Sequence, residues 1–532
     1  MSRRHLLKSG AVGAAGVAAL PLLSPRRSFA QKPKVTATVS PATTPFVEPL
    51  PIPPVLQPVA ALSPVPNPAA HQLYLQHLPT KFYEVRVRAA LHSFHPQLPP
   101  QKIFGYNGIT PGPTIHARYG EPILARFFND LPADHTGFGV PQCSPHLHNL
   151  HSAPESDGNP VNFFDPGFFW DNHYAMFCPR NDSREALGTL WLHDHRFDFT
   201  AQNVYRGLAM FFLAFDALDA GVEVASTTYP KALRLPSGQY DVPLMLADKK
   251  FDSTGNLEFD VFNLDGMLGD KYTVNGKIQP FFKVARRKYR FRILDGGPSR
   301  FYQLHLSNNA PFTLISNDGN LLPKPLTVSQ LYLGVAERAD VIIDFSKYPI
   351  GTEIVLENRL AQTDGRGPSG EIINPGAPLL KFIVDRDVAS DPSMIPATLR
   401  ELPPITLSEV VATRTFKFDR TNGAWAVNGA LFDPNVVSAR VKRGTAEIWY
   451  FENGGGGWHH PIHAHHEEFR ILERDGVAPP LHEQGRKDVV TLAPGEVVKV
   501  FIRFSDFTGR YPIHCHNTVH EDHAMMTFFE VV

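Results

Sequence analysis

Short runs of alternating apolar and polar residues recur along most of this chain, and they constrain its fold more than any other feature. From about Phe82 onward, runs rich in Val, Ile, Phe and Tyr are separated by Gly, Pro, Asn and Asp, as at residues 83–87, 289–294 and 497–502. Successive side chains of a strand point to opposite faces, so a period of two indicates strands with one buried face. Many short strands at this spacing predict an all-β chain of sandwiches or barrels.

Chain length and two breaks in composition divide the chain into predicted domains. At roughly 150 residues per domain, 532 residues suggest three or four globular units. The strand pattern breaks near residues 219–238 and 385–404, which are rich in Ala, Ser, Pro and Asp. We therefore expect three β-sandwich domains, at residues 71–218, 239–386 and 400–532.

The first residues differ from the rest and are typical of a bacterial export signal. The paired Arg3 and Arg4 precede an apolar, alanine-rich stretch, and a small-x-small site ends at Ala30. This pattern predicts a twin-arginine-type signal peptide over residues 1–30, recognised by the twin-arginine export machinery. A single membrane anchor is the alternative, although the apolar stretch 9–23 is shorter than the roughly 20 residues that span a bilayer. We expect a periplasmic or secreted protein without stable membrane insertion.

A proline-rich segment follows the predicted signal. Eleven prolines lie within residues 31–70. Because proline lacks a backbone N–H and fits neither a helix interior nor a central strand, we expect an extended segment that runs over a surface.

Charge and cysteine content exclude two classes of protein. The 51 basic residues balance 52 acidic ones, so a nucleic-acid partner is not expected. Three cysteines are too few for a disulfide framework in a chain of this size. Cys143 and Cys178 could pair with each other or stay free, and in either case Cys515 has no cysteine partner.

We also expect the protein to be a monomer.

Four His-x-His pairs stand out among the 24 histidines. They are His146/His148, His193/His195, His463/His465 and His514/His516. Two pairs fall in the first predicted domain and two in the third. Residues i and i+2 of a strand share a face, so each pair can bind one metal ion or two neighbouring ions. Eight imidazoles can therefore converge where the first and third domains meet.

A cysteine inside the last pair indicates a second kind of metal site. The segment from His514 to Met526 offers imidazole, thiolate and thioether donors, and His460 precedes the third pair. Two histidines, one cysteine and a weak axial methionine form a blue-copper electron-transfer site. On a strand Cys515 points away from its two flanking histidines, so electrons that arrive at Cys515 reach the histidine cluster through a few covalent bonds. Three coppers in the cluster and one outside it would store the four electrons that reduce dioxygen to water.

These motifs resemble those of the multicopper oxidase family, and within it the branch of bilirubin oxidases and bacterial spore-coat laccases. The resemblance runs from about Phe46 to the C-terminus. The motifs that carry it lie at residues 105–108, 111–114, 146–148, 156–158, 191–195, 203–208, 287–292, 336–340, 487–490 and 514–525. The resemblance implies three consecutive cupredoxin-like Greek-key β-sandwich domains.

The resemblance also implies a copper ligand set and four coppers per chain. The type 1 ligands would be His460, Cys515, His520 and Met525. The type 2 ligands would be His146 and His463. The type 3 ligands would be His148, His193, His195, His465, His514 and His516.

Two carboxylates match residues that relay protons to reduced oxygen in this family. They are Asp157 and Glu521, and four electrons delivered to dioxygen do require four protons from nearby acids. The alternative for Asp157 is a turn residue before Gly158, and the alternative for Glu521 is a structural role. Trp458 matches a tryptophan beside the type 1 site, where it would tune the copper or only cover it.

Several histidines fall outside this ligand set. His459 and the pair His466 and Glu467 depart from the family pattern, which bears on the polarity of the surface near the coppers. We expect the following histidines to lie on the surface or beside copper ligands without binding copper themselves: His151, His173, His305, His466 and His523.

The predicted function is therefore a copper oxidase. It would couple one-electron oxidations of phenolic, aromatic amine or tetrapyrrole reductants to the reduction of O2 to water. The alternative is a metal-ion oxidase, with Mn(II) favoured over Fe(II) and Cu(I). Only 8 methionines and no methionine-rich insert argue against Cu(I). A copper-free structural relative would have lost ligands, and a copper nitrite reductase would have two sandwich domains.

Overall fold

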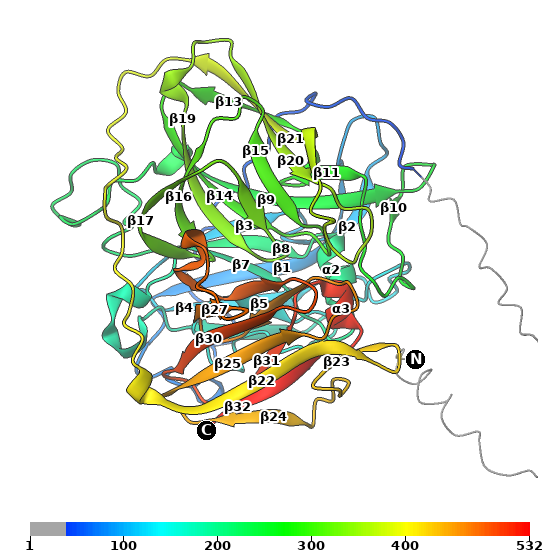
Figure 1. Ribbon diagram of the computed structural model, residues 1–532, viewed down its shortest axis with the longest axis vertical. Helices are drawn as coiled ribbons and strands as arrows, with labels where there is room; N and C mark the ends of the chain where they lie inside the picture. Colours follow the sequence, from blue (N-terminus) through cyan, green and yellow to red (C-terminus); the bar gives the residue numbers. More distant parts are fainter. Residues whose placement is uncertain (1–38) are drawn as a thin grey trace, which may run out of the picture. The chain divides into compact units, whose positions relative to one another are not determined.

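The computed structural model describes residues 39–532, and the predicted signal peptide at residues 1–30 lies outside the described residues. Strands dominate the described part and its helices are short, so the prediction of an all-β chain is confirmed (Figure 1). The helices are α2 (Thr200–Arg206), α3 (Thr518–Asp522), η1 (Pro68–Ala70), η2 (Pro179–Asn181), η3 (Ser183–Glu185), η4 (Gly238–Tyr240), η5 (Phe345–Lys347), η6 (Leu407–Glu409) and η7 (Leu481–Glu483). In the described residues, none of these helices has the length and apolar content needed to cross a membrane.

The first pair of sheets contains the first two histidine pairs. One sheet has the order β2 (Gln101–Tyr106), β1 (Lys81–His92), β4 (Ile123–Asn129), β6 (Phe169–Tyr174). The other has the order β3 (Gly112–Arg118), β8 (Ala209–Phe215), β7 (Thr189–Asp194), β5 (Pro145–His148). One buried apolar cluster draws on both sheets, with Val85 and Phe127 from the first and Leu192 and Phe212 from the second. Burial between two sheet faces is what the alternating pattern predicts.

The second pair of sheets carries no His-x-His pair. One sheet has the order β12 (Lys277–Ile278), β11 (Lys271–Val274), β9 (Asp241–Phe251), β14 (Lys288–Asp295), β19 (Arg338–Asp344), β16 (Phe312–Asn317), β17 (Asn320–Val328), with β10 (Leu257–Glu258) beside β9. The other has the order β13 (Phe281–Ala285), β21 (Ile372–Arg386), β20 (Glu353–Leu360), β15 (Tyr302–Leu306), β18 (Leu331–Leu333). These strands, green in Figure 1, enclose their own apolar cluster.

The third pair of sheets contains the last two histidine pairs. One sheet has the order β23 (Ala424–Val427), β22 (Val410–Thr421), β25 (Thr445–Asn453), β30 (Val497–Phe504), β27 (Phe469–Arg474), β28 (Arg486–Lys487). The other has the order β24 (Val437–Val441), β32 (Met526–Val531), β31 (Gly509–Cys515), β26 (His460–Ala464), β29 (Val489–Leu492). Cys515 and Met525 lie within the apolar cluster of this pair.

All three pairs of sheets share one pattern of parallel strand pairs. In the first, β1 pairs with β4 and β3 pairs with β8. In the second, β9 pairs with β14 and β13 pairs with β21. In the third, β22 pairs with β25 and β24 pairs with β32. A parallel pair needs a crossover connection, and here the chain crosses between the two sheets of each sandwich.

The segments between the three pairs of sheets contain little regular structure. Between β8 and β9 the chain forms only η4, and between β21 and β22 it forms only η6. Within residues 39–70, the structure shows η1 and single bridges of Pro49 to Phe281 and Val55 to Thr114. This extended segment therefore contacts both the second and the first pair of sheets.

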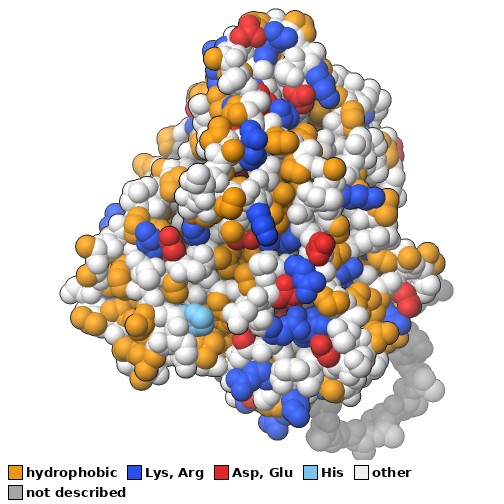
Figure 2. All heavy atoms as spheres, turned by 90° about the vertical axis from the view of Figure 1, so that its left-hand side faces the viewer, with side chains coloured by type: hydrophobic (Ala, Val, Ile, Leu, Met, Phe, Trp, Pro, Cys, Tyr) orange, Lys and Arg blue, Asp and Glu red, His pale blue; other side chains and the backbone are white. Residues whose placement is uncertain are grey.

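The surface and the cysteines complete the description. Figure 2 shows one face, on which basic and acidic side chains are interspersed among hydrophobic ones. Cys143 and Cys178 are free thiols, so the disulfide that the sequence left open does not form in this structure.

Candidate metal centre

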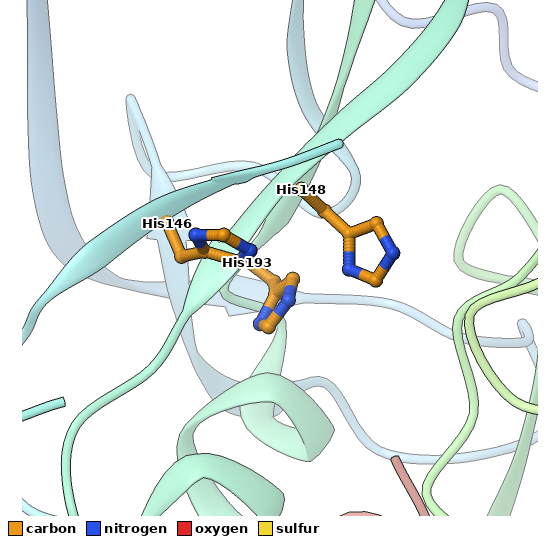
Figure 3. A group of neighbouring side chains, drawn as sticks. All are labelled: His146, His148 and His193. Atoms are coloured by element: carbon orange, nitrogen blue, oxygen red, sulfur yellow. The ribbon is translucent and has the colours of Figure 1, made fainter. Parts of the chain in front are cut away.

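The histidines of all four pairs gather in one buried cluster between the first and third pairs of sheets. Each of the eight side chains is at most 1% exposed. The rings of His148 and His463 stack with centroids 3.8 Å apart, and those of His146 and His465 stack at 3.9 Å. Figure 3 shows His146 and His148 from β5 beside His193 from β7. The cluster thus joins imidazoles that lie more than 300 residues apart in the sequence.

Strand register explains how the cluster forms. In the first pair of sheets, β5 and β7 are antiparallel and place His146 opposite His193. In the third, β26 and β31 are antiparallel and place His463 opposite His514. Directly opposed residues on neighbouring strands have their side chains on the same face. The i, i+2 spacing then adds the second histidine of each pair to that face.

Most of these imidazoles use one ring nitrogen to bind a protein acceptor. Nδ1 of His193 donates to the Asp194 carbonyl at 2.9 Å, and Nδ1 of His463 donates to the Asp488 carbonyl at 2.9 Å. Nδ1 of His146 donates to the Asp157 carbonyl. Such a bond fixes the ring orientation and leaves the other nitrogen available to a metal ion, as is usual for metal-bound histidines.

The remaining nitrogens lack partners, and this supplies the test of whether metal ions fit here. Within the described residues, the following buried nitrogens have no hydrogen-bond partner: Nε2 of His146, His193 and His463, Nδ1 of His148, and both ring nitrogens of His516. Buried polar atoms are nearly always paired, so this set of unpaired nitrogens in one cluster indicates that the imidazoles bind metal ions. Transition-metal ions that prefer imidazole fit this donor set.

The protonation state of the rings agrees with this interpretation. Burial holds the pKa of His148, His193 and His516 well below its usual range, and neighbouring imidazoles lower it further. Neutral imidazole is the form that binds metal ions. The imidazoles of the cluster are therefore unprotonated at neutral pH and able to bind metal ions.

A second group combines two imidazoles with the only cysteine in this part of the fold. Sγ of Cys515 lies 3.5 Å from Nδ1 of His460 and 3.6 Å from Nδ1 of His520, and these two nitrogens are 3.2 Å apart. Nε2 of His520 donates to the Asp265 carbonyl at 3.0 Å, which directs Nδ1 toward the cysteine. Met525 is fully buried in the same apolar cluster, and its carbonyl accepts from the Cys515 N–H at 3.1 Å.

The electrostatics of Cys515 also fit a bound cation. Burial raises the pKa of the Cys515 thiol well above its usual range. A thiolate at this position therefore requires a positive charge beside it, and a coordinated metal ion deprotonates a thiol outright. Two imidazoles, one thiolate and a nearby thioether match the donors of a blue-copper site.

The two groups are joined by one short stretch of backbone. His514 and His516 belong to the eight-histidine cluster, whereas Cys515 belongs to the second group. Side-chain alternation around the end of β31 produces this division. The covalent path from Cys515 to either neighbouring imidazole spans a single peptide unit.

The two predicted carboxylates both contact imidazoles of the cluster. Oδ2 of Asp157 accepts from Nδ1 of His465 at 2.8 Å. Oε2 of Glu521 lies 3.1 Å from Nδ1 of His514, and its Oε1 lies 3.5 Å from Nδ1 of His195. Asp157 is 1% exposed and Glu521 is 3% exposed. Both acids therefore lie beside imidazoles of the cluster. Neither a turn role for Asp157 nor a structural role for Glu521 requires such a contact.

Other contacts to the site were missed by sequence reasoning. Oδ1 of Asp488 lies 3.3 Å from Nε2 of His148, and both oxygens of Asp488 accept from Arg338 of the second pair of sheets, at 2.9 and 2.6 Å. The Trp425 ring lies over His520 with centroids 3.9 Å apart. Arg338 and Asp488 lie within motifs of the resemblance, but no local signal indicated that they pair.

The other histidines outside the ligand set have varied surroundings. His173 packs against Tyr74 and donates to the His77 carbonyl at 2.8 Å. His305 is partly exposed, and Nδ1 of His523 donates to the Val519 carbonyl at 2.6 Å. His151 and His466 are both buried, at 4% exposure, within a group of carboxylates.

A glycine turn holds Asp157 against His146, and its substitution provides a prediction. Gly158 has φ +78°, and an added Cβ would lie 2.3 Å from the Pro145 oxygen and 2.4 Å from Cα of His146. We expect Gly158→Ala to displace this turn and to lower both thermal stability and copper content.

The control is Gly120→Ala, where Gly120 has φ +88° but nothing lies within 4 Å of the added Cβ. The control should show only the backbone cost of about 1–2 kcal/mol. Equal effects of the two substitutions on the thermal midpoint would contradict the prediction.

Comparisons with known proteins agree with this geometry. Family models described as multicopper oxidase match residues 92–216 and 405–532. A bilirubin oxidase of Albifimbria verrucaria is 36% identical over 512 residues, covering 93% of this chain and 83% of the relative. A laccase of Bacillus subtilis is 32% identical, covering 90% of this chain and 97% of the relative. The crystal structure of a laccase from Pediococcus acidilactici superposes with a TM-score of 0.76 at 27% identity, covering 93% of this chain and 95% of that one.

Proposed function

The chain belongs to the multicopper oxidase family and is a copper oxidoreductase that uses dioxygen, and from this premise we propose which residues hold the coppers and what kind of reductant they serve. The observation that carries the proposal is the position of Cys515. Its sulfur faces His460 and His520 while its sequence neighbours belong to the eight-histidine cluster. One strand end thus connects an electron-accepting site to an oxygen-reducing site.

We assign a type 1 copper to His460, Cys515, His520 and Met525. The close approach of two Nδ1 atoms and Sγ supports this assignment. The buried thioether of Met525 is the candidate weak axial ligand. When bound, copper at such a site supplies reversible one-electron transfer.

We assign three further coppers to the histidine cluster, which gives four per chain. His146 and His463 would hold the type 2 copper. The type 3 pair would be held by His148, His193, His195, His465, His514 and His516. The unpaired ring nitrogens and the neutral state of the rings support this assignment.

The two carboxylates would hold and deliver the protons that dioxygen reduction consumes. Asp157 lies beside Nδ1 of His465, and Glu521 lies beside Nδ1 of His514 on the short helix α3. Reduction of one dioxygen to two waters takes four protons, and a buried cluster receives them only through nearby acids.

Glu521→Gln tests the proton role. We expect the rate of reoxidation by dioxygen to fall by about 100-fold or more, because loss of a positioned proton donor costs on the order of 100-fold. Anaerobic reduction of the type 1 site should keep its rate. Stopped-flow absorbance measures both half-reactions. The control is Asp522→Asn on the same helix, where Asp522 accepts from the Ala201 N–H at 3.1 Å. Equal slowing of both half-reactions by Glu521→Gln would contradict a proton role.

The surroundings of His520 support an aromatic or tetrapyrrole reductant. The Trp425 ring covers His520, and half-buried Trp458 meets Trp425 edge to face at 5.3 Å. Arg420 lies 4.3 Å and Arg366 lies 4.7 Å from the Trp458 ring centroid. Aromatic rings with adjacent guanidinium groups favour flat, conjugated molecules through stacking and cation–π contacts. Similarity to a bilirubin oxidase and to laccases points the same way.

Oxygen uptake with different reductants tests this choice. We expect purified, copper-loaded enzyme to consume dioxygen with phenols, aromatic amines or bilirubin, without accumulation of hydrogen peroxide. The comparisons do not favour the alternative of a manganese oxidase. Oxygen uptake with Mn(II) but with none of the organic reductants would contradict the proposal.

We also propose export through the twin-arginine machinery to the periplasm or the medium, as a monomer. The paired Arg3 and Arg4 and the small-x-small site ending at Ala30 support this. N-terminal sequencing of exported protein should find a chain that begins at Gln31, and light scattering should give the mass of one chain. Retention in the cytoplasm with an intact N-terminus would contradict export.

A further inference from the structure

A second group of potential metal ligands lies outside both sites described above. It contains His151, which follows β5, together with His466 and Glu467 after β26 and Asp506 after β30. One donor atom from each residue lies within 4.8 Å of the others.

The donor atoms of this group lie close to one another. Nε2 of His466 lies 3.4 Å from Oε1 of Glu467 and 3.7 Å from Oδ1 of Asp506. Nδ1 of His151 lies 3.6 Å from Oδ2, the other carboxylate oxygen of Asp506. Tetrahedral ligands at about 2.0–2.1 Å from an ion are about 3.3–3.4 Å from each other. Rotations that turn one donor atom of each side chain toward a common centre would be needed to reach that spacing.

His466 is buried and unpaired, which independently indicates a missing ligand. Its side chain is 0% exposed, and neither ring nitrogen has a hydrogen-bond partner among the described residues. The ring stacks on Tyr511 with centroids 4.4 Å apart, which fixes the direction of Nε2. A buried imidazole without hydrogen-bond partners is costly unless an ion binds it.

Carboxylates surround the two imidazoles of this group. Glu468 is paired with Arg486, which also binds Glu185 at 2.7 Å. Within the described residues, Glu467 and Asp506 have no ion pair with a lysine or arginine, and the imidazoles of His151 and His466 are their partners. A metal ion that binds here would take the place of the protons on these groups.

A small pocket adjoins one member of this group. Its lining includes Glu467 and Glu468 together with Arg470, Arg486 and Arg503.

We propose that His151, His466, Glu467 and Asp506 bind one divalent transition-metal ion, separate from the coppers of the oxidase. Two imidazoles disfavour calcium and magnesium, which prefer oxygen ligands, and favour ions of the zinc type. His151 belongs to the first pair of sheets and the other three ligands belong to the third. The ion therefore cross-links the two parts of the fold that share the histidine cluster, and it stabilises their association.

A crystallographic experiment on the unaltered enzyme tests the site directly. Copper-loaded crystals are equilibrated with zinc chloride, and anomalous difference maps are recorded on both sides of the zinc absorption edge. We expect a zinc peak between the four side chains. Copper peaks at Cys515 and in the histidine cluster would appear independently of it, so failure of this site and failure of the copper assignment are distinguishable. No peak between His151 and His466 at saturating zinc would overturn the proposal.

A solution experiment identifies the ligands. Zinc is titrated calorimetrically into copper-loaded wild-type enzyme, Asp506→Asn and the matched control His305→Gln, whose histidine is remote and partly exposed. We expect one zinc ion per wild-type chain and an affinity at least about tenfold lower for Asp506→Asn, because even outer-shell changes cost 10–100-fold. His305→Gln should bind like the wild type. Copper content is measured in each variant to verify that zinc has not replaced copper. Wild-type zinc affinity in folded Asp506→Asn would overturn the proposal, and the crystallographic result decides if that variant does not fold.

Discussion

Replacing Cys515 with serine is expected to remove the intense blue absorption and to lower oxidase turnover by more than about 100-fold. Even changes in residues that only contact metal ligands cost 10–100-fold, and Cys515 would itself be a ligand. A serine hydroxyl does not ionise at neutral pH and cannot provide the thiolate that a blue-copper site needs. Visible absorption and steady-state oxygen uptake measure the two effects.

The histidine cluster should retain its coppers in this variant, because none of its eight imidazoles is changed. The matched control is Cys178→Ser, which removes a free, half-buried thiol elsewhere in the fold. That control should keep its colour and activity. A Cys515→Ser enzyme that is still blue would contradict the assignment of the electron-accepting site.

Arg338→Met is expected to destabilise the fold by about 3–5 kcal/mol, which is the usual cost of leaving a buried charge without its partner. Arg338 is 0% exposed as a side chain and binds both oxygens of Asp488. Asp488 in turn contacts His148, so the same substitution should lower copper incorporation. The urea midpoint and the copper content of the purified variant measure these effects.

Arg86→Met is the control for this prediction. Arg86 pairs with Asp130 at 3.0 Å, but its side chain is 37% exposed. Exposed ion pairs contribute about 0–1 kcal/mol, so this control should change stability little. Equal stability of the two variants would show that Arg338 does not support the cluster from the second pair of sheets.

Much of the fold and of the candidate site could be predicted from local sequence pattern. Alternation of apolar and polar residues predicted strands because burial of one sheet face selects every second residue. The His-x-His spacing predicted shared faces for the same reason, and the structure brings all eight imidazoles together. The predicted domain boundaries and the individual copper ligands stay predictions.

Contacts between distant segments could not be predicted in this way. The Asp265 carbonyl that orients His520 lies 255 residues away in the sequence, and Arg338 lies 150 residues from Asp488. Such pairs depend on how whole sheets pack, and neither partner has a distinctive local pattern. His151 and His466 were expected to lie on the surface or beside copper ligands, because neither belongs to one of the four His-x-His pairs. Only the fold shows that they face the same carboxylates.

The copper content of correctly matured, copper-loaded enzyme tests the central claim most directly. One electron-accepting site and one oxygen-reducing cluster, built from the proposed ligands, together require about four copper ions per chain. One of these coppers should show the absorption of a thiolate-bound copper. Mass spectrometry of metals together with quantitative protein analysis provides this ratio. A value near four or above is the expected result. Fewer than about four coppers per chain, or zinc in the histidine cluster in their place, would contradict the account.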